Sequence, residues 1–167
     1  LKHRPKALKA IATSATTAPG IDVPMEGGIF LNFMVSWPFY AASNRSLDDV
    51  RYSDSARWAA LNRNWYASGR AYRDLPAIDG STNPVFAEWL RHPAYDTYWQ
   101  AMTPQGDEFA AIDIPVLATT GYFDGAQIGA LHYFREHLRH RPGADHTLLI
   151  GPYEHFTMQS GVPPVVQ

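Results

Sequence analysis

An acid and a histidine stand at two points where an apolar run gives way to a loop. Asp124 follows the run 114–120 as part of Gly-Tyr-Phe-Asp, and His155 follows the run 147–150 as part of Gly-Pro-Tyr-Glu-His. A carboxylate beside an imidazole fixes the tautomer of the ring and stabilises the ring when it takes up a proton, as in a nucleophilic triad. The two residues therefore indicate acid-base chemistry, provided that the fold brings them together.

The segments around these residues read as strand, helix and strand. Residues 114–120 and 147–150 are short apolar runs of the kind that a parallel sheet buries on both faces. Residues 126–140 show a helical apolar stripe. The stripe consists of Ile128, Leu131, Phe134 and Leu138. Because a right-handed crossover leaves the carboxyl ends of two parallel strands at one edge, Asp124 and His155 are expected to share one crevice.

Each residue also has an ordinary interpretation. Asp124 precedes a predicted helix and could cap its N-terminus, and a single loop histidine is most often solvated. The order of the two residues, each after a buried strand with one helix between, favours the pair. The serine of a triad is not evident, since no Gly-x-Ser-x-Gly elbow occurs in the chain.

The composition excludes several other classes of function. A net charge of −2 over 167 residues gives no basic footprint for nucleic acid or an anionic membrane, and no apolar run reaches membrane-spanning length. Without cysteine there is no thiolate ligand or cysteine nucleophile. His137 and His140 have no third ligand nearby and are expected to complement a helix dipole. No metal and no cofactor is therefore expected.

A block of different character interrupts the alternating pattern. Residues 25–105 are rich in aromatic side chains at helical spacing, and the predicted helices cover 29–42, 54–68, a segment from Asn83-Pro84 onward, and 95–102. Pro38 is expected to kink or end the first of them. The expected organisation is a partial α/β core over 1–24 and 106–167, in which 7–12 forms a strand, with a helical insertion over 25–105.

The insertion is expected to cover the crevice. Most of its aromatic residues should form its own core, whereas Trp37, Phe39 and Tyr40 are expected to line an apolar substrate pocket. Asp22 and Glu26, at the entrance of the insertion, could supply charge to the site, although exposed acids on a loop rich in proline and glycine are usually solvated.

Several motifs together resemble the cocaine esterase family. They are Tyr-Phe-Asp-Gly, Gly-Pro-Tyr-Glu-His, the phrase His-Pro-Ala-Tyr-Asp-Thr-Tyr-Trp at 92–99, and Ala-Leu-Lys-Ala-Ile-Ala at 7–12. This family of serine hydrolases is related to the X-prolyl dipeptidyl peptidases. The resemblance implies a partial α/β-hydrolase fold, comprising the last three parallel strands, with a helical cap insertion. It also implies that Asp124 is the triad acid, that His155 is the triad base, and that the serine lies upstream of this chain.

The expected function follows from the pair and the resemblance together. The chain is interpreted as a fragment of a serine hydrolase that cleaves small-molecule esters or amides through an acyl-serine, and the fragment alone is expected to be inactive. The alternatives are a non-catalytic binding or assembly domain and, within the enzyme class, an X-prolyl dipeptidyl peptidase or a cephalosporin acylase.

An open strand edge predicts self-association. The resemblance favours a periplasmic or secreted location.

Overall fold

The computed structural model of the chain describes residues 2–42 and 45–159. The chain divides into two compact units. We call Leu1–Gly28 with Ala94–Gln167 the core unit, and Ile29–Pro93 the helical unit. Within the described residues, no helix combines the length and the apolar character needed to cross a membrane.

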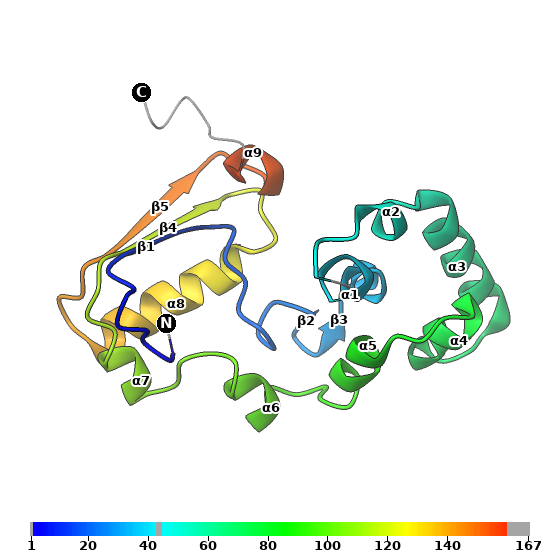
Figure 1. Cartoon of the computed structure of the whole chain (residues 1–167), viewed down its shortest axis with the longest axis horizontal. Coiled ribbons are helices and arrows are strands. Elements are labelled where there is room, and N and C mark those ends of the chain that lie inside the picture. The colour runs from blue at the N-terminus through cyan, green and yellow to red at the C-terminus, as the bar shows by residue number, and fades with distance from the viewer. Residues whose placement is uncertain (1, 43–44, 160–167) are drawn as a thin grey trace. The chain divides into compact units, whose positions relative to one another are not determined.

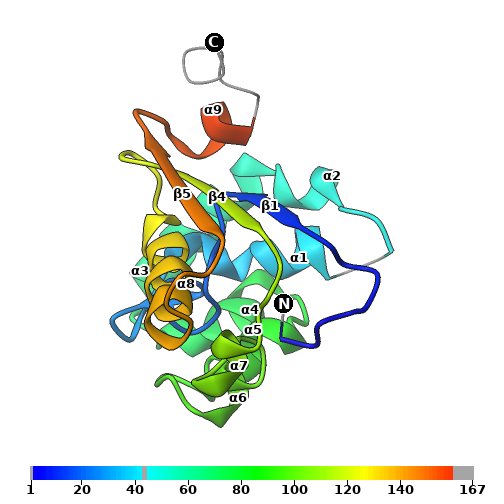
Figure 2. The same ribbon diagram turned by 90° about the vertical axis from the view of Figure 1, so that its left-hand side faces the viewer.

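The core unit is built on a parallel sheet of three strands. Strands β1 (Ile11–Ser14), β4 (Val116–Gly121) and β5 (His146–Gly151) lie side by side in the order β1-β4-β5. Helix α8 (Gln127–His140) connects β4 to β5 and lies along one face of the sheet (Figures 1 and 2). This arrangement confirms the predicted class, an α/β fold with three parallel strands of a partial α/β-hydrolase.

The face of the sheet beneath α8 is the interior of the core unit. Val116 and Ala118 are buried there, and Val116 clusters with Phe109 and Ile112. Short elements complete the core unit. They are β2 (Met25–Glu26), α6 (Thr97–Gln100), α7 (Asp107–Ala110) and α9 (His155–Gln159).

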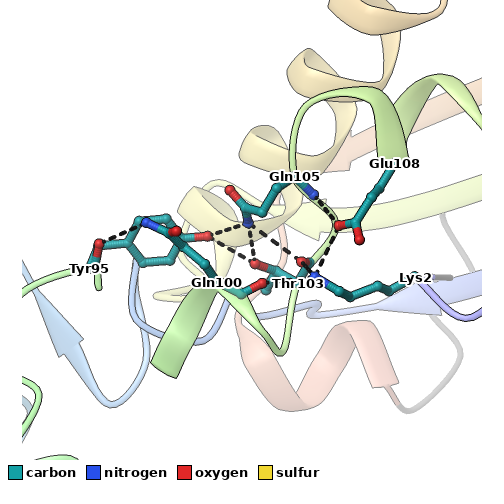
Figure 3. A network of polar contacts seen from close by, with 6 residues as sticks. All are labelled: Lys2, Tyr95, Gln100, Thr103, Gln105 and Glu108. Atoms are coloured by element: carbon teal, nitrogen blue, oxygen red, sulfur yellow. Dashed lines mark hydrogen bonds and ion pairs between the residues drawn. The ribbon is translucent and has the colours of Figure 1, made fainter. Parts of the chain in front are cut away.

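Residues 94–108 belong to the core unit rather than to the helical unit. A polar network joins this segment to the N-terminal segment: the Lys2 ammonium donates to the carbonyl oxygens of Gln100 and Thr103, at 3.0 Å each, and pairs with Glu108 (Figure 3). The Thr103 hydroxyl, which is fully buried, contacts Tyr95 Oη at 2.9 Å. The Lys2 ammonium lowers the pKa of the Glu108 carboxyl. The segment predicted as the end of the insertion is thus bonded to the N-terminal segment of the core unit.

The helical unit is inserted between β1 and β4 in the chain. Its elements are β3 (Ile29–Phe30), η1 (Asn32–Val35), α1 (Trp37–Ala41), α2 (Asp49–Tyr52), α3 (Ser55–Ser68), η2 (Tyr72–Asp74), α4 (Leu75–Asp79) and α5 (Pro84–Trp89). The predicted helix 54–68 is confirmed, with Asp54 accepting from the Arg57 N–H and Gly69 ending the helix in the left-handed region at φ 64°. The helix start at Asn83-Pro84 is also confirmed, since Asn83 Oδ1 accepts from the Phe86 N–H.

The single helix predicted over residues 29–42 is wrong. The structure has β3, the short 3₁₀ turn η1 and then α1, and Pro38 lies in the first turn of α1, so it neither kinks nor ends a helix. Proline suits the first turn because the N–H that it lacks would have no partner inside the helix.

The second face of the sheet motivates a prediction about self-association. Strand pairing places Ala12, Leu117 and Thr147 in one row on the side opposite Val116, and all three are exposed, Leu117 by 42%. Because an uncovered apolar sheet face with an open strand edge favours association, light scattering should give a mass that rises with concentration. Leu117→Lys should reduce this rise, whereas Tyr66→Lys, at an 87% exposed position of α3, should not. A constant monomer mass would contradict the prediction.

Candidate active site

Asp124 and His155 meet at the carboxyl edge of the sheet. His155 Nδ1 lies 2.8 Å from Asp124 Oδ1, across 31 residues of sequence. The Asp124 side chain is fully buried, whereas 43% of the His155 side chain remains exposed. The structure therefore brings together the two residues that the sequence singled out, with the carboxylate inside and the imidazole at the surface.

Backbone hydrogen bonds tie together the loops that carry the pair. The Tyr122 N–H donates to the Gly151 carbonyl and the Phe123 N–H donates to the Tyr153 carbonyl, at 3.0 Å each. These bonds extend the β4–β5 pairing, whose last partners are Gly121 and Gly151, into the loops. The relative position of the two loops is therefore set by main-chain atoms.

Glycine is required where the loops cross. A Cβ atom at Gly121 would overlap the carbonyl oxygen of Tyr153, and a Cβ at Gly151 would overlap the ring of Tyr153. Tyr153 itself is buried, only 4% exposed. The close approach of Gly121 to Tyr153 leaves no room for a side chain between the two loops.

A backbone N–H group also holds the Asp124 carboxylate. Its Oδ1 accepts from the Ala126 N–H at 3.1 Å, immediately before α8, while Oδ2 is buried and has no hydrogen-bond donor among the described residues. The alternative interpretation as a helix cap is wrong, because the N-cap residue of α8 is Ala126 and the Asp124 carboxylate accepts from the N–H of that residue, not from an N–H of the helix.

His155 begins the short helix α9, whose first turn is closed by a reciprocal side-chain pair. The Glu154 N–H donates to Thr157 Oγ1 at 3.1 Å, and the Thr157 N–H donates to Glu154 Oε1 at 2.8 Å. This is the arrangement of a capping box, which fixes how the chain enters a helix. It sets the backbone of His155 at the end of β5.

The hydrogen bond assigns the tautomer of the ring. An ionised carboxylate only accepts, so Nδ1 of His155 carries the proton and Nε2 of the neutral ring has a free lone pair. An exposed Nε2 of this kind can take a proton from a hydroxyl group, and the buried Asp124 charge stabilises the resulting imidazolium. The geometry is that of a general base held by its orienting acid.

The three predicted pocket residues lie in the helical unit, on or beside α1. Phe39 is 5% exposed and stacks on Trp58, with the Arg51 guanidinium 3.9 Å from its ring centroid. Trp37 and Tyr40 are half-buried and both contact Tyr52, at centroid distances of 5.7 and 4.9 Å. All three side chains pack against aromatic residues of their own unit, and their role in lining a substrate pocket stays a prediction.

His137 and His140, the two histidines of α8 that the sequence analysis considered as ligands, have structural partners. His137 is buried and its Nε2 lies 3.1 Å from the carbonyl of Ile112, so it packs inside the unit and does not simply face the helix end. His140 pairs with Glu136. Among the described residues, no group of three or more potential ligands is placed to hold a metal ion.

Asp22 is a residue that sequence reasoning misjudged. It is 2% exposed instead of solvated, and burial raises the pKa of its carboxyl while hydrogen bonds from backbone N–H groups oppose the rise. A signal was present in the sequence: α8 starts after Ala126, which has no capping side chain, so its N-terminus needs an acceptor from elsewhere.

Comparison with known proteins gives one family. The model of the X-Pro dipeptidyl-peptidase family (S15) matches residues 1–157. No curated protein is significantly similar to the chain. Among solved structures, the trigonal crystal structure of an acetylester hydrolase from Corynebacterium glutamicum is similar, with 12% identity and a TM-score of 0.41 over 95% of this chain and 51% of that one. The chain thus spans about half the length of that protein.

Proposed function

The chain belongs to the X-Pro dipeptidyl-peptidase family (S15), and from this premise we propose that it is part of the catalytic domain of a serine hydrolase of esters or amides. In this proposal Asp124 and His155 are the acid and base of a Ser-His-Asp triad, and the serine comes from a segment that precedes Leu1. The observation that carries the proposal is the 2.8 Å hydrogen bond from an exposed imidazole to a fully buried carboxylate at the ends of adjacent parallel strands.

The proposed reaction uses Nε2 of His155 twice in each half-cycle. Nε2 takes the serine proton as the serine oxygen attacks the substrate carbonyl carbon, and the resulting imidazolium gives that proton to the departing alkoxide or amine. Water then attacks the acyl-serine. Nε2 takes a proton from this water and gives it to the serine oxygen, and the carboxylic acid is released. Asp124 keeps its charge throughout, because its task is to hold the ring and stabilise the imidazolium.

Oδ2 of Asp124 is available for one further hydrogen-bond donor in the complete domain. A buried carboxylate oxygen without a donor is costly, so such atoms normally have a partner. In the proposal, a group from the upstream segment or an ordered water supplies this donor when the domain is whole.

The experiment compares the 167-residue chain with the same polypeptide extended upstream in its reading frame. Both are treated with a fluorophosphonate probe and assayed with p-nitrophenyl acetate and with an aminoacyl-proline (X-Pro) p-nitroanilide. The extended polypeptide should be labelled on a serine upstream of Leu1 and should hydrolyse at least the aryl ester. Cleavage of the X-Pro anilide as well indicates an X-prolyl peptidase, whereas cleavage of the ester alone indicates an esterase. The chain alone should show no turnover.

Two results would overturn the proposal. One is turnover by the 167-residue chain that disappears in Asp124→Ala, because the nucleophile would then lie within the chain. The other is an extended polypeptide with glycine or alanine at the elbow position and no labelling, which would favour a binding or assembly domain.

A further inference from the structure

Asp22 forms a bridge between two distant parts of the core unit. Its Oδ1 accepts from the Ala18 N–H and its Oδ2 accepts from the Gly129 N–H, at 2.7 Å each. Ala18 lies on the loop after β1, and Gly129 lies in the first turn of α8, 107 residues after Asp22. Both bonds are short and both are buried, as expected for hydrogen bonds to a charged acceptor.

Helix α8 depends on acceptors from outside its own sequence. The first N–H groups of a helix have no partner inside it, and the N-cap residue Ala126 offers no side chain. Asp124 accepts from the Ala126 N–H and Asp22 accepts from the Gly129 N–H. Asp22 therefore holds an N–H of the first turn, whereas Asp124 holds the residue that precedes this turn. A negative charge at this end also complements the helix dipole.

Gly129 allows the loop to press directly on the helix. A Cβ at this position would lie 2.5 Å from Ala18 N and from Asp22 Oδ2, and 2.7 Å from Thr16 O. The Asp22 carboxylate and the backbone of Gly129 are therefore in direct contact, so a shift of the carboxylate should also shift the first turn of α8.

The loop that carries Asp22 is itself held in one conformation. The Gly20 N–H donates to the Val23 carbonyl at 2.7 Å, and Gly20, at φ +80°, packs against the side chain of the buried Trp99. Trp99 ends the phrase 92–99 that the sequence singled out. A fixed loop gives the Asp22 carboxylate a fixed position, which is what a positioning role requires.

We propose that Asp22 is a positioning residue of the Asp124–His155 pair: it fixes the first turn of α8 and, through that turn, the short link from which Asp124 reaches His155. Its meaning for catalysis rests on the proposed function, but the geometry that it controls can be measured without catalysis.

The test uses the 167-residue chain labelled with ¹⁵N-histidine. The reporter is the proton on His155 Nδ1, assigned by its loss in Asp124→Ala, and its exchange with solvent is measured by NMR. Asp22→Asn keeps the shape of the side chain but sets an amide NH₂ against one of the two N–H donors. Because a hydrogen bond to a charged acceptor is lost, exchange of the reporter proton should accelerate about tenfold or more.

A second variant reaches the same contact from the other side. Gly129→Ala leaves the charge of Asp22 in place and favours the helix by its intrinsic propensity, yet its methyl group collides with Asp22 Oδ2. It should accelerate exchange of the His155 proton in the same direction. This variant keeps the proposal testable if Asp22→Asn does not fold.

The matched control is Ile112→Ala. Ile112 is 3% exposed and packs with Phe109 and Val116 at the opposite edge of the sheet, so its truncation destabilises the same unit without touching either loop. It should leave the exchange of the reporter proton unchanged under conditions where the protein is folded. Unchanged exchange in folded Asp22→Asn or Gly129→Ala, or equal acceleration in Ile112→Ala, would reduce Asp22 to a general stabiliser and overturn the proposal.

The readout also separates this proposal from the proposed function. If the extended polypeptide is not a hydrolase, the exchange result still decides whether Asp22 positions the pair. If it is a hydrolase, Asp22→Asn should lower kcat with little change in KM, because Asp22 is only 2% exposed and its carboxylate is bonded to the first turn of α8.

Discussion

Asp124→Ala is expected to lower kcat of the extended polypeptide about 10⁴-fold, since it removes both the orientation and the charge that the imidazole needs. Asp124→Asn should cost less, about 10²- to 10³-fold. The reason is specific to this structure. A single oxygen, Oδ1, accepts from both the Ala126 N–H and the His155 ring, so an amide oxygen in that place can keep both hydrogen bonds.

The loss from the parent to Asp124→Asn measures what the charge contributes, and the further loss from Asp124→Asn to Asp124→Ala measures what the two hydrogen bonds contribute. Ester hydrolysis under saturating substrate gives kcat, and circular dichroism confirms folding. Asp145→Asn is the matched control, because Asp145 is an exposed acid immediately before β5 and should retain full activity. If either Asp124 variant keeps activity within about tenfold of the parent, Asp124 is not the triad acid.

Gly121→Ala is expected to have the largest structural effect of any single methyl group near the site. The new Cβ would overlap the Tyr153 carbonyl oxygen, and backbone atoms on both sides are already fixed by hydrogen bonds between the two loops. Overpacking against backbone should cost about 3 kcal/mol or more of unfolding free energy and separate Asp124 from His155. Urea denaturation gives the first quantity and the His155 Nδ1 proton signal reports the second.

Gly125→Ala is the control for this substitution. Gly125 lies in the same loop, but no atom lies within 4 Å of its added Cβ and its φ is not in the left-handed region. Its stability should change by less than about 1 kcal/mol, and the removal of glycine freedom from the unfolded chain favours a small gain. Equal losses in both variants would mean that the loop tolerates no side chain for reasons other than the contact with Tyr153.

The parts of the fold that sequence predicted well depend on local patterns. The apolar run 114–120, the stripe of α8 and the run 147–150 gave β4, α8 and β5 within a few residues, and the handedness of the crossover then placed Asp124 beside His155. The resemblance to the cocaine esterase and X-prolyl dipeptidyl peptidase family is confirmed by the family match over residues 1–157.

The parts that it missed depend on contacts between distant segments. Residues 29–42 contain enough apolar side chains for one helix, but the segment forms β3, the 3₁₀ turn η1 and the short helix α1 instead. Pro38 lies in the first turn of α1. Asp22 sits in a segment rich in proline and glycine that resembles a solvated loop, and only its approach to Gly129 makes it buried. No periodicity in either segment reveals such a contact, because its partner lies on another element.

The link between the two loops has a consequence for how this site can diversify. The Tyr122 and Phe123 contacts that align the pair use only main-chain atoms, and the two side chains are 66% and 75% exposed. Substitutions at these positions can therefore change the surface of the loop that carries Asp124 while the alignment persists. If the proposed function is correct, a library randomised at positions 122 and 123 should vary the surface near the site while the Asp124–His155 hydrogen bond is kept.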